Sequence, residues 1–147
     1  MSVRYYEDIG IGETRTLGSF SLSKDEILAF AEQYDPLPFH TDEAAATDSM
    51  FGGLIASGWQ TAANCQRKVS DGFLSETACE GGRAVEHLQF FEPVRPGDVV
   101  DVDMEVTDKH PGGDPEHGVV KTRVAARSDG STVAEMVILP IVRKREA

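Results

Sequence analysis

The chain carries two patterns of hydrophobic and polar residues and changes from one to the other a little past its midpoint. In the segment 23–34 (SKDEILAFAEQY), apolar residues recur at the i, i+3, i+4 and i+7 spacing of a helix with one buried face. Ser23 and Glu26 form a capping box at its start. Pro36 ends the helix, because the residue before a proline is disfavoured in the helical region. The pattern therefore predicts a helix that places Asp35 just beyond its C-terminal end.

Two further helices are predicted before the pattern changes. The segment 41–49 (TDEAAATDS) has Thr41 as its N-cap and acidic residues in its first turn. The segment 57–72 (SGWQTAANCQRKVSDG) starts near Ser57, ends near Gly72 and is rich in small or apolar side chains. Such a composition predicts a helix that packs closely against a sheet. A glycine-rich apolar stretch, FGGLIASG, separates the two helices.

From residue 83 onward the hydrophobic period is two, which predicts half-buried antiparallel strands. The clearest strand is 98–109 (DVVDVDMEVTDK), in which Val and Met alternate with acidic residues and Thr. Three more segments have strand character, and SDGS predicts a hairpin turn between the last two: AVEHLQFFEPV (84–94), VVKTRVAARS (119–128) and STVAEMVILPIVRK (131–144). Pro140 within the last segment predicts an edge strand or a bulge.

These elements predict an α+β fold. A weak N-terminal strand (TRTLGSF) and the helices come first, and four strands in a meander follow. An antiparallel sheet of this kind wraps around one long helix. The 147 residues fit one domain with a substantial core. A small sheet leaves a face and edges to cover, so packing alone favours a dimer.

Composition excludes several classes of protein. The formal net charge of −11 argues against a nucleic-acid-binding protein, which needs a basic face, and against docking on anionic membranes. The N-terminus MSVRYYEDIGIG has no apolar signal-peptide core, and no segment is apolar enough to span a membrane, which predicts a cytoplasmic location. Cys65 and Cys79 lack CxxC spacing and predict reduced thiols, with Cys65 in a core. The four histidines are scattered and predict no zinc site.

The stretch QYDPLPFHTD (33–42) holds the first candidate chemistry, Asp35 followed five residues later by His40. Pro36 and Pro38 fix two φ angles and restrain the backbone between them. A histidine titrates at about pH 6.5 and suits proton abstraction from water, while a nearby carboxylate can orient its ring or pass a proton. Two interpretations follow from the residues alone: a positioned acid–base pair, or an ordinary turn at a helix end with an exposed ring.

The second candidate lies at the start of the helix 57–72. Backbone N–H groups there have no intrahelical partner and carry partial positive charge, so Ser57 or Gly58 can present a donor to a substrate carbonyl. Gly58 also has no side chain to obstruct a substrate. The alternative is a closely packed loop that needs glycine for a positive φ.

The stretch YDPLPFHTDEAAATDSMFGGLIASGW, with the later FFEPVRPGD, resembles the MaoC-like dehydratases, relatives of the (R)-specific enoyl-CoA hydratases. The resemblance covers nearly the whole chain and implies a single hotdog domain over residues 1–147. In that fold a curved antiparallel sheet wraps a long central helix, short helices lie on an overhanging segment, and the protein is usually dimeric. The resemblance implies that Asp35 and His40 are the catalytic pair and that Gly58, helped by Ser57, binds the thioester carbonyl.

The reaction that the resemblance implies is reversible syn hydration of a trans-2-enoyl thioester to an (R)-3-hydroxyacyl thioester. Coenzyme A or a carrier pantetheine then enters as part of the substrate, and no metal or redox cofactor is expected. The sequence departs from the (R)-hydratase signature D-x-N-P-x-H at Leu37, which replaces its Asn. This departure bears on straight-chain enoyl-CoA specificity more than on the acid–base pair.

Two other functions stay open. One is an acyl-CoA thioesterase, which commonly uses a carboxylate on the central helix; residues 57–70 contain none. The other is a noncatalytic acyl-thioester-binding subunit or the partner subunit of a hydratase heterodimer. The presence of both Asp35 and His40 argues against that function. The expected partners are therefore an acyl thioester and a second copy of the chain.

Overall fold

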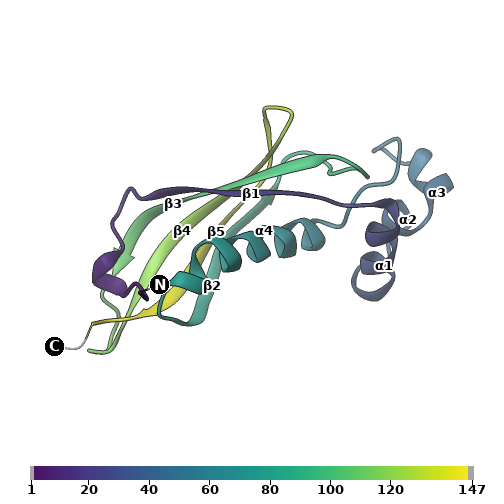
Figure 1. Ribbon diagram of the computed structural model, residues 1–147. Helices are drawn as coiled ribbons and strands as arrows, with labels where there is room; N and C mark the ends of the chain where they lie inside the picture. The colour runs from purple at the N-terminus through teal and green to yellow at the C-terminus, as the bar shows by residue number, and fades with distance from the viewer. Residues whose placement is uncertain (1, 146–147) are drawn as a thin grey trace.

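The computed structural model describes residues 2–145 as one five-stranded antiparallel sheet with a long helix against it and short helices at one end (Figure 1). The strands are Thr14–Ser21 (β1), Cys79–Phe90 (β2), Val99–His110 (β3), His117–Ser128 (β4) and Ser131–Arg143 (β5). The helices are Lys24–Tyr34 (α1), Pro38–Thr41 (α2), Glu43–Thr47 (α3) and Gly58–Gly72 (α4), with short 3₁₀ turns at Tyr6–Asp8 and Leu74–Glu76. Residues 1, 146 and 147 of the predicted single domain lie outside the described residues.

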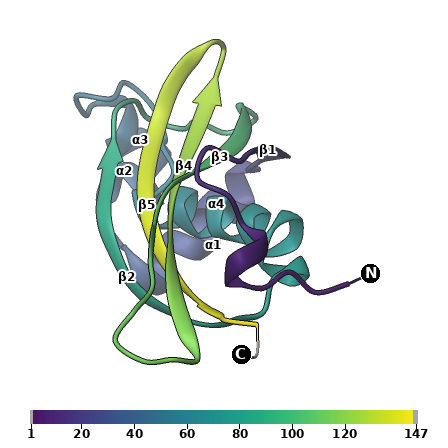
Figure 2. The same cartoon turned by 90° about the vertical axis from the view of Figure 1, so that its left-hand side faces the viewer.

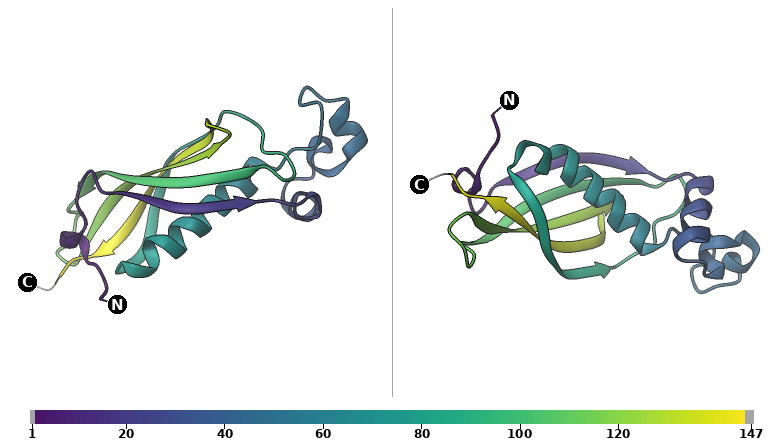
Figure 3. Two further views of the ribbon diagram at one scale, coloured as in Figure 1. Left: turned by 45° about the horizontal axis from the view of Figure 1, so that its top comes forward. Right: turned by 90° about the horizontal axis from the view of Figure 1, so that it is seen from below.

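The sheet curves around α4, which crosses its concave face (Figures 2 and 3). The α4 side chains Cys65 and Val69 are buried with Phe73 just beyond its end. The alternation predicted for β3 is confirmed: its inward residues are 0–1% exposed, namely Val100, Val102, Met104 and Val106. The predicted α+β class, a curved antiparallel sheet around one long helix, is thereby confirmed. Trp59, in the first turn of α4, is 62% exposed, so the apolar side chains of this helix are not all buried.

The prediction of a four-stranded meander is wrong for β2. The strand order is β1-β3-β4-β5-β2, so only β3, β4 and β5 form a meander, and β2 pairs with β5 at the far edge. β2 also begins at Cys79 and ends at Phe90, whereas the pattern placed it at 84–94. The hydrophobic pattern identifies an extended segment, but its pairing partner depends on long-range contacts that the segment itself does not encode. The SDGS hairpin between β4 and β5 is confirmed, with positive φ at Asp129 and Gly130.

Pro140 lies in an inner strand, so the edge-strand interpretation is wrong. β5 runs between β4 and β2, and Pro140 faces Gly82 of β2. From this pair to the pair of Ile138 and Val85, β2 advances by three residues while β5 advances by two. The irregularity therefore lies in the neighbouring strand. An extra residue opposite a proline loosens the ladder where the proline has no N–H to donate.

The overhanging segment begins as predicted and then differs. The capping box of α1 is confirmed, with reciprocal hydrogen bonds between Ser23 and Glu26. The predicted helix 41–49 is instead α2 and α3, and the N-cap of α3 is Asp42, which accepts from two backbone N–H groups. Thr41 ends α2 and donates its hydroxyl to the Leu37 carbonyl. Because Pro38 is favourable at the first helical position, a separate turn forms early and carries His40.

Candidate active site

Asp35 and His40 meet at the junction between α1 and α2. Asp35 is the C-cap of α1, where its backbone N–H donates to the Ala31 carbonyl at 2.8 Å. The short turn of α2 then brings the His40 ring back, so that Nε2 lies 3.5 Å from Asp35 Oδ2. His40 is only 5% exposed, whereas Asp35 keeps partial access to solvent. The structure thus brings the predicted pair together and excludes the interpretation of an exposed histidine on a turn.

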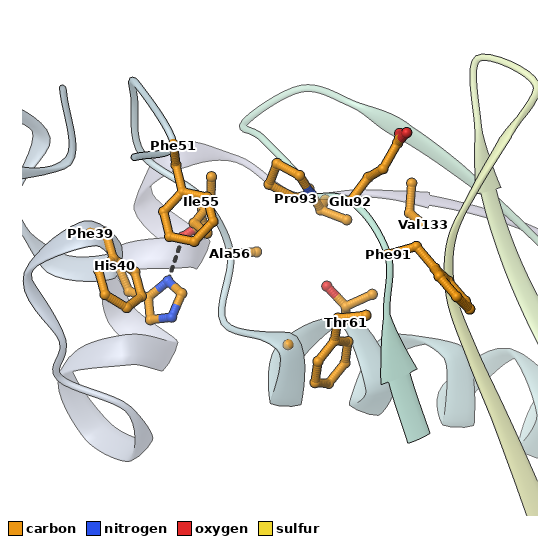
Figure 4. Close-up of a pocket in the computed structure, with 13 residues that line it drawn as sticks. Phe39, His40, Phe51, Ile55, Ala56, Thr61, Phe91, Glu92, Pro93 and Val133 are labelled. Carbon is orange, nitrogen blue, oxygen red and sulfur yellow. Dashed lines mark hydrogen bonds between the residues drawn. The ribbon is translucent and has the colours of Figure 1, made fainter. Parts of the chain in front are cut away.

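The other nitrogen of His40 fixes the tautomer of the ring. Nδ1 lies 2.8 Å from the backbone carbonyl oxygen of Ile55, which can only accept (Figure 4). Nδ1 therefore carries the hydrogen, and the neutral ring has its lone pair on Nε2, toward Asp35. The Nε2–Oδ2 separation exceeds ordinary hydrogen-bond length. Two acceptors facing each other in this way suit a water molecule that donates one hydrogen to each.

Ser57 supports this pair from the start of α4. Its hydroxyl donates to Asp35 Oδ2 at 2.7 Å and accepts from the Trp59 backbone N–H at 3.2 Å. Ser57 is the N-cap of α4, which confirms the predicted start of the helix near this residue, and its side chain is fully buried. The hydroxyl hydrogen is directed to Asp35, so the hydroxyl of Ser57 positions the carboxylate. The predicted oxyanion role, which belongs to the backbone N–H groups of Ser57 and Gly58, stays a prediction.

Gly58 is the first residue of α4 and faces a cavity. No protein acceptor among residues 2–145 pairs with its backbone N–H. A Cβ at this position would lie 2.5 Å from the ring of Phe90, so a larger residue would require that ring to move. The alternative reason for glycine, a positive φ, applies to Gly52 at 68° and not to Gly58. Close approach rather than backbone conformation therefore explains the glycine.

The cavity has a volume of about 320 Å³ and lies between the overhanging segment, the start of α4 and the end of β2 (Figure 4). His40 and Gly58 line it, whereas Asp35 and Ser57 do not. Its walls are largely apolar and include four phenylalanines, Phe39, Phe51, Phe90 and Phe91. Of the pair Asp35 and His40, only the imidazole of His40 is therefore in contact with the cavity.

Sequence reasoning missed the side chains that shape this cavity. Phe39 packs edge-on against His40, with ring centroids 4.5 Å apart, and Phe51 packs on Phe39 at 5.3 Å. The segment that contains Phe90 and Phe91 was predicted only as the end of a strand. A signal existed for Phe39, which precedes His40 directly, but none connected Phe51 or the end of β2 with this site.

Three other predictions from the sequence concern the cysteines, a metal site and a membrane-spanning segment. Burial raises the pKa of the Cys65 thiol to about 12, so it is a protonated core residue, as predicted. Over residues 2–145 no three His, Cys, Asp or Glu side chains gather as a metal-ligand set. No helix in the same range is long and apolar enough to cross a membrane. The predictions on cofactors and cellular location stay predictions.

Comparison with known proteins gives a consistent result. Residues 9–128 match the family described as MaoC like domain. The chain is 34% identical over 115 residues to a 3-hydroxybutyryl-CoA dehydratase of Methylorubrum extorquens, covering 76% of this chain and 69% of that protein. It is 31% identical over 140 residues to an (R)-specific enoyl-CoA hydratase of Rhodospirillum rubrum, covering 90% and 88%. The crystal structure of a MaoC-like dehydratase from Rhodospirillum rubrum has a TM-score of 0.84 at 30% identity, covering 98% of this chain and 99% of that chain.

The family match extends over most of the chain, and the protein belongs to the MaoC-like domain family. Its curved sheet and central helix are those of the hotdog fold, as the resemblance implied. The relatives support a function of the hydratase or dehydratase type.

Proposed function

We propose that this protein is a hydro-lyase that adds water reversibly and with syn geometry to a trans-2-enoyl-CoA or a related enoyl thioester. The product is an (R)-3-hydroxyacyl thioester. The observation that carries the proposal is the arrangement of Asp35 and His40 at the cavity, with Nδ1 of the ring committed to the Ile55 carbonyl. That commitment leaves Nε2 as a base at a position where it shares a water with a carboxylate.

In the proposed reaction, His40 Nε2 accepts a proton from the water as the water oxygen bonds to C3 of the substrate. The proton that C2 receives comes from the same face, which gives syn addition. The proton that His40 takes from the water is the one delivered to C2, so that the water supplies both the oxygen on C3 and the hydrogen on C2. Asp35 assists this transfer as acid or relay. Because Asp35 does not line the cavity, the geometry favours a relay in which His40 Nε2 is the last donor to C2.

Charge that develops on the thioester oxygen is stabilised by the backbone N–H of Gly58 at the positive end of α4. Removal of one such donor costs about 2.7–4 kcal/mol of transition-state stabilisation in other enzymes. Phe90 covers Gly58 closely, so the carbonyl approaches along the edge of that ring. The proposal involves no metal or redox cofactor, and coenzyme A or pantetheine belongs to the substrate.

The proposed assembly is a homodimer in which β2 joins a second copy. β2 pairs with β5 on one side only, and most of its residues are exposed, including Val85 at 58%. A groove of about 420 Å³ beside it is lined by apolar side chains such as Leu74, Ile138 and Pro140. A free strand edge with apolar neighbours is a template for pairing. Sedimentation equilibrium should give twice the chain mass; a monomer at all concentrations would contradict this assembly.

The activity is tested by a spectrophotometric screen of trans-2-enoyl-CoA substrates that follows loss of the conjugated thioester absorbance. The expected product is the (R)-3-hydroxyacyl-CoA, identified by chiral analysis. Asp35→Asn should lower kcat by roughly 100-fold or more, within the range of general acid–base catalysis, while the circular dichroism spectrum is unchanged. Absence of hydration with every enoyl-CoA would replace this proposal by the noncatalytic binding subunit. A thioesterase is disfavoured because Gly58 and Thr61 are the α4 residues that face the cavity.

A further inference from the structure

The cavity beside His40 is lined by few charged side chains, although the chain carries 39 of them, 14 basic and 25 acidic. Among residues 2–145 of this chain, thirteen line it, and none of these is a lysine or an arginine. Of these thirteen, only His40 and Glu92 have ionisable side chains. Glu92 lies on the wall opposite His40, and its carboxylate points away from the centre of the cavity, toward the rim (Figure 4).

His40 does not supply a donor to an anion in this cavity. The Nδ1 hydrogen is taken by the Ile55 carbonyl, and Nε2 is directed to Asp35. The one hydroxyl on the cavity wall belongs to Thr61. A ligand carboxylate in the cavity would therefore meet no cation among the thirteen lining residues, and the exposed Glu92 carboxylate at its edge would add a weak repulsion.

The basic residues of the chain lie outside this cavity, and most of them pair with other groups. Arg95, in the turn that follows the cavity wall, donates its side chain to the Phe51 carbonyl and does not line the cavity. Arg83 lines the groove along β2 instead. The Lys68 ammonium lies near Gly18 of β1. Most of the others pair with acidic residues, as Arg123 does with Glu105.

From this inventory we infer that the acyl group accepted by the cavity is uncharged, and that the site discriminates against acyl thioesters ending in a second carboxylate. The inference rests on the proposed function for the identity of the thioester and adds the chemical class of its acyl chain. The physical reason is desolvation. A carboxylate that leaves water for an apolar wall without a cation or several hydrogen bonds loses hydration that nothing replaces.

The test compares pairs of thioesters that differ only by a methyl group or a carboxylate at the end of the same chain. For turnover, the pair is trans-2-pentenoyl-CoA and trans-glutaconyl-CoA; kcat/KM should favour the neutral member by roughly 100-fold or more. For binding, the pair is pentanoyl-CoA and glutaryl-CoA, measured by isothermal titration calorimetry. Neither of these saturated thioesters can be hydrated, so the binding ratio does not depend on catalysis.

Glu92→Gln removes the fixed negative charge and should raise the affinity for glutaryl-CoA relative to pentanoyl-CoA by roughly two- to tenfold. Glu116→Gln is the matched control, because it makes the same charge change in the exposed loop before β4, outside the cavity. It should leave the ratio at the wild-type value. An equal effect of both variants would show a general charge effect and overturn the role of Glu92.

The possible outcomes separate this inference from the proposed function. Hydration of glutaconyl-CoA as efficient as that of pentenoyl-CoA would overturn the uncharged-acyl inference and leave the hydratase proposal intact. Preferential binding of pentanoyl-CoA without hydration of either enoyl thioester would do the reverse. Equal binding of glutaryl-CoA and pentanoyl-CoA would overturn the inference whatever the activity.

Discussion

Two histidines sit beside carboxylates at opposite ends of this molecule, and they are built for different tasks. His40 lies under the overhanging helices, and His117 lies at the start of β4, near the C-terminal end of β5 (Figure 1). His117 has a carboxylate at each ring nitrogen, with Nε2 2.5 Å from Glu80 and Nδ1 3.2 Å from Asp114. His40 has a carboxylate near one nitrogen only.

The two histidines differ in the group that faces Nδ1, which is a carboxylate for His117 and a backbone carbonyl for His40. Carboxylates at both nitrogens favour the imidazolium, and the hydrogen bond to Glu80 raises the pKa of His117. The result is an ion-paired clip on a partly exposed surface that joins β2, β4 and the loop before β4. A backbone carbonyl at Nδ1, as in His40, accepts a hydrogen without adding a full negative charge. The comparison shows that a nearby carboxylate alone does not identify a catalytic histidine.

The largest expected effect comes from replacing each of the two histidines by alanine and comparing kcat. His40→Ala should lower hydration kcat by roughly 100- to 10,000-fold, because it removes the proposed base. His117→Ala should keep kcat within about twofold, since it removes a surface ion pair remote from the cavity. The measurement is the same enoyl-CoA absorbance assay on both variants. Comparable losses in the two variants would contradict the division of roles.

A second, smaller effect separates positioning from stability. Ser57→Ala and Ser23→Ala each remove an N-cap hydroxyl and should each lower the free energy of unfolding by about 1 kcal/mol. Only Ser57 also donates to Asp35, so only Ser57→Ala should lower kcat, by roughly tenfold, and change its pH profile. Urea unfolding and the hydration assay measure the two quantities. An unchanged pH profile in Ser57→Ala would leave Ser57 with a capping role alone.

The smallest effect concerns the clip at His117. The pKa of His117 is raised from 6.5, so its contribution to stability is complete below about pH 6.5 and disappears as the pH rises through the higher folded-state value. The pKa of Glu80 is lowered from 4.5 by the same hydrogen bond, so its contribution is lost as the pH falls through the lower folded-state value. The Tm difference between wild type and His117→Gln should therefore be largest near pH ~6 and shrink above pH ~8. A difference independent of pH would show that the ion pair does not stabilise the fold.

The sequence predicted the elements whose signals are local. The capping box and the following proline defined α1, and strict alternation defined β3 with all four inward side chains buried. The predicted helix from near Ser57 to near Gly72 likewise matches α4. Each of these signals acts within a few residues, so the chain needs no distant partner to express it.

The features that the sequence did not predict depend on contacts distant along the chain. The local pattern of β2 is that of a strand, but nothing in it selects β5 as its neighbour. Thr41 was predicted as the N-cap of the next helix, but the turn that starts at Pro38 includes Thr41, and Asp42 is the N-cap instead. At the site, the spacing of Asp35 and His40 left two interpretations open, and the resemblance to the MaoC-like dehydratases favoured the catalytic pair. The Ile55 carbonyl that fixes the ring, and the phenylalanines of the cavity, were beyond the reach of spacing alone.

The side-chain oxygen of Ser57 has two roles at once, because it caps the start of α4 and donates its hydrogen to the carboxylate of the proposed catalytic pair. Stability and activity often trade against each other when a protein is engineered, since active sites store strain that stabilising substitutions remove. At position 57 the two properties depend on the same atom and should rise and fall together. A selection for folding alone, applied to a library at this position, would therefore also retain the geometry of the site.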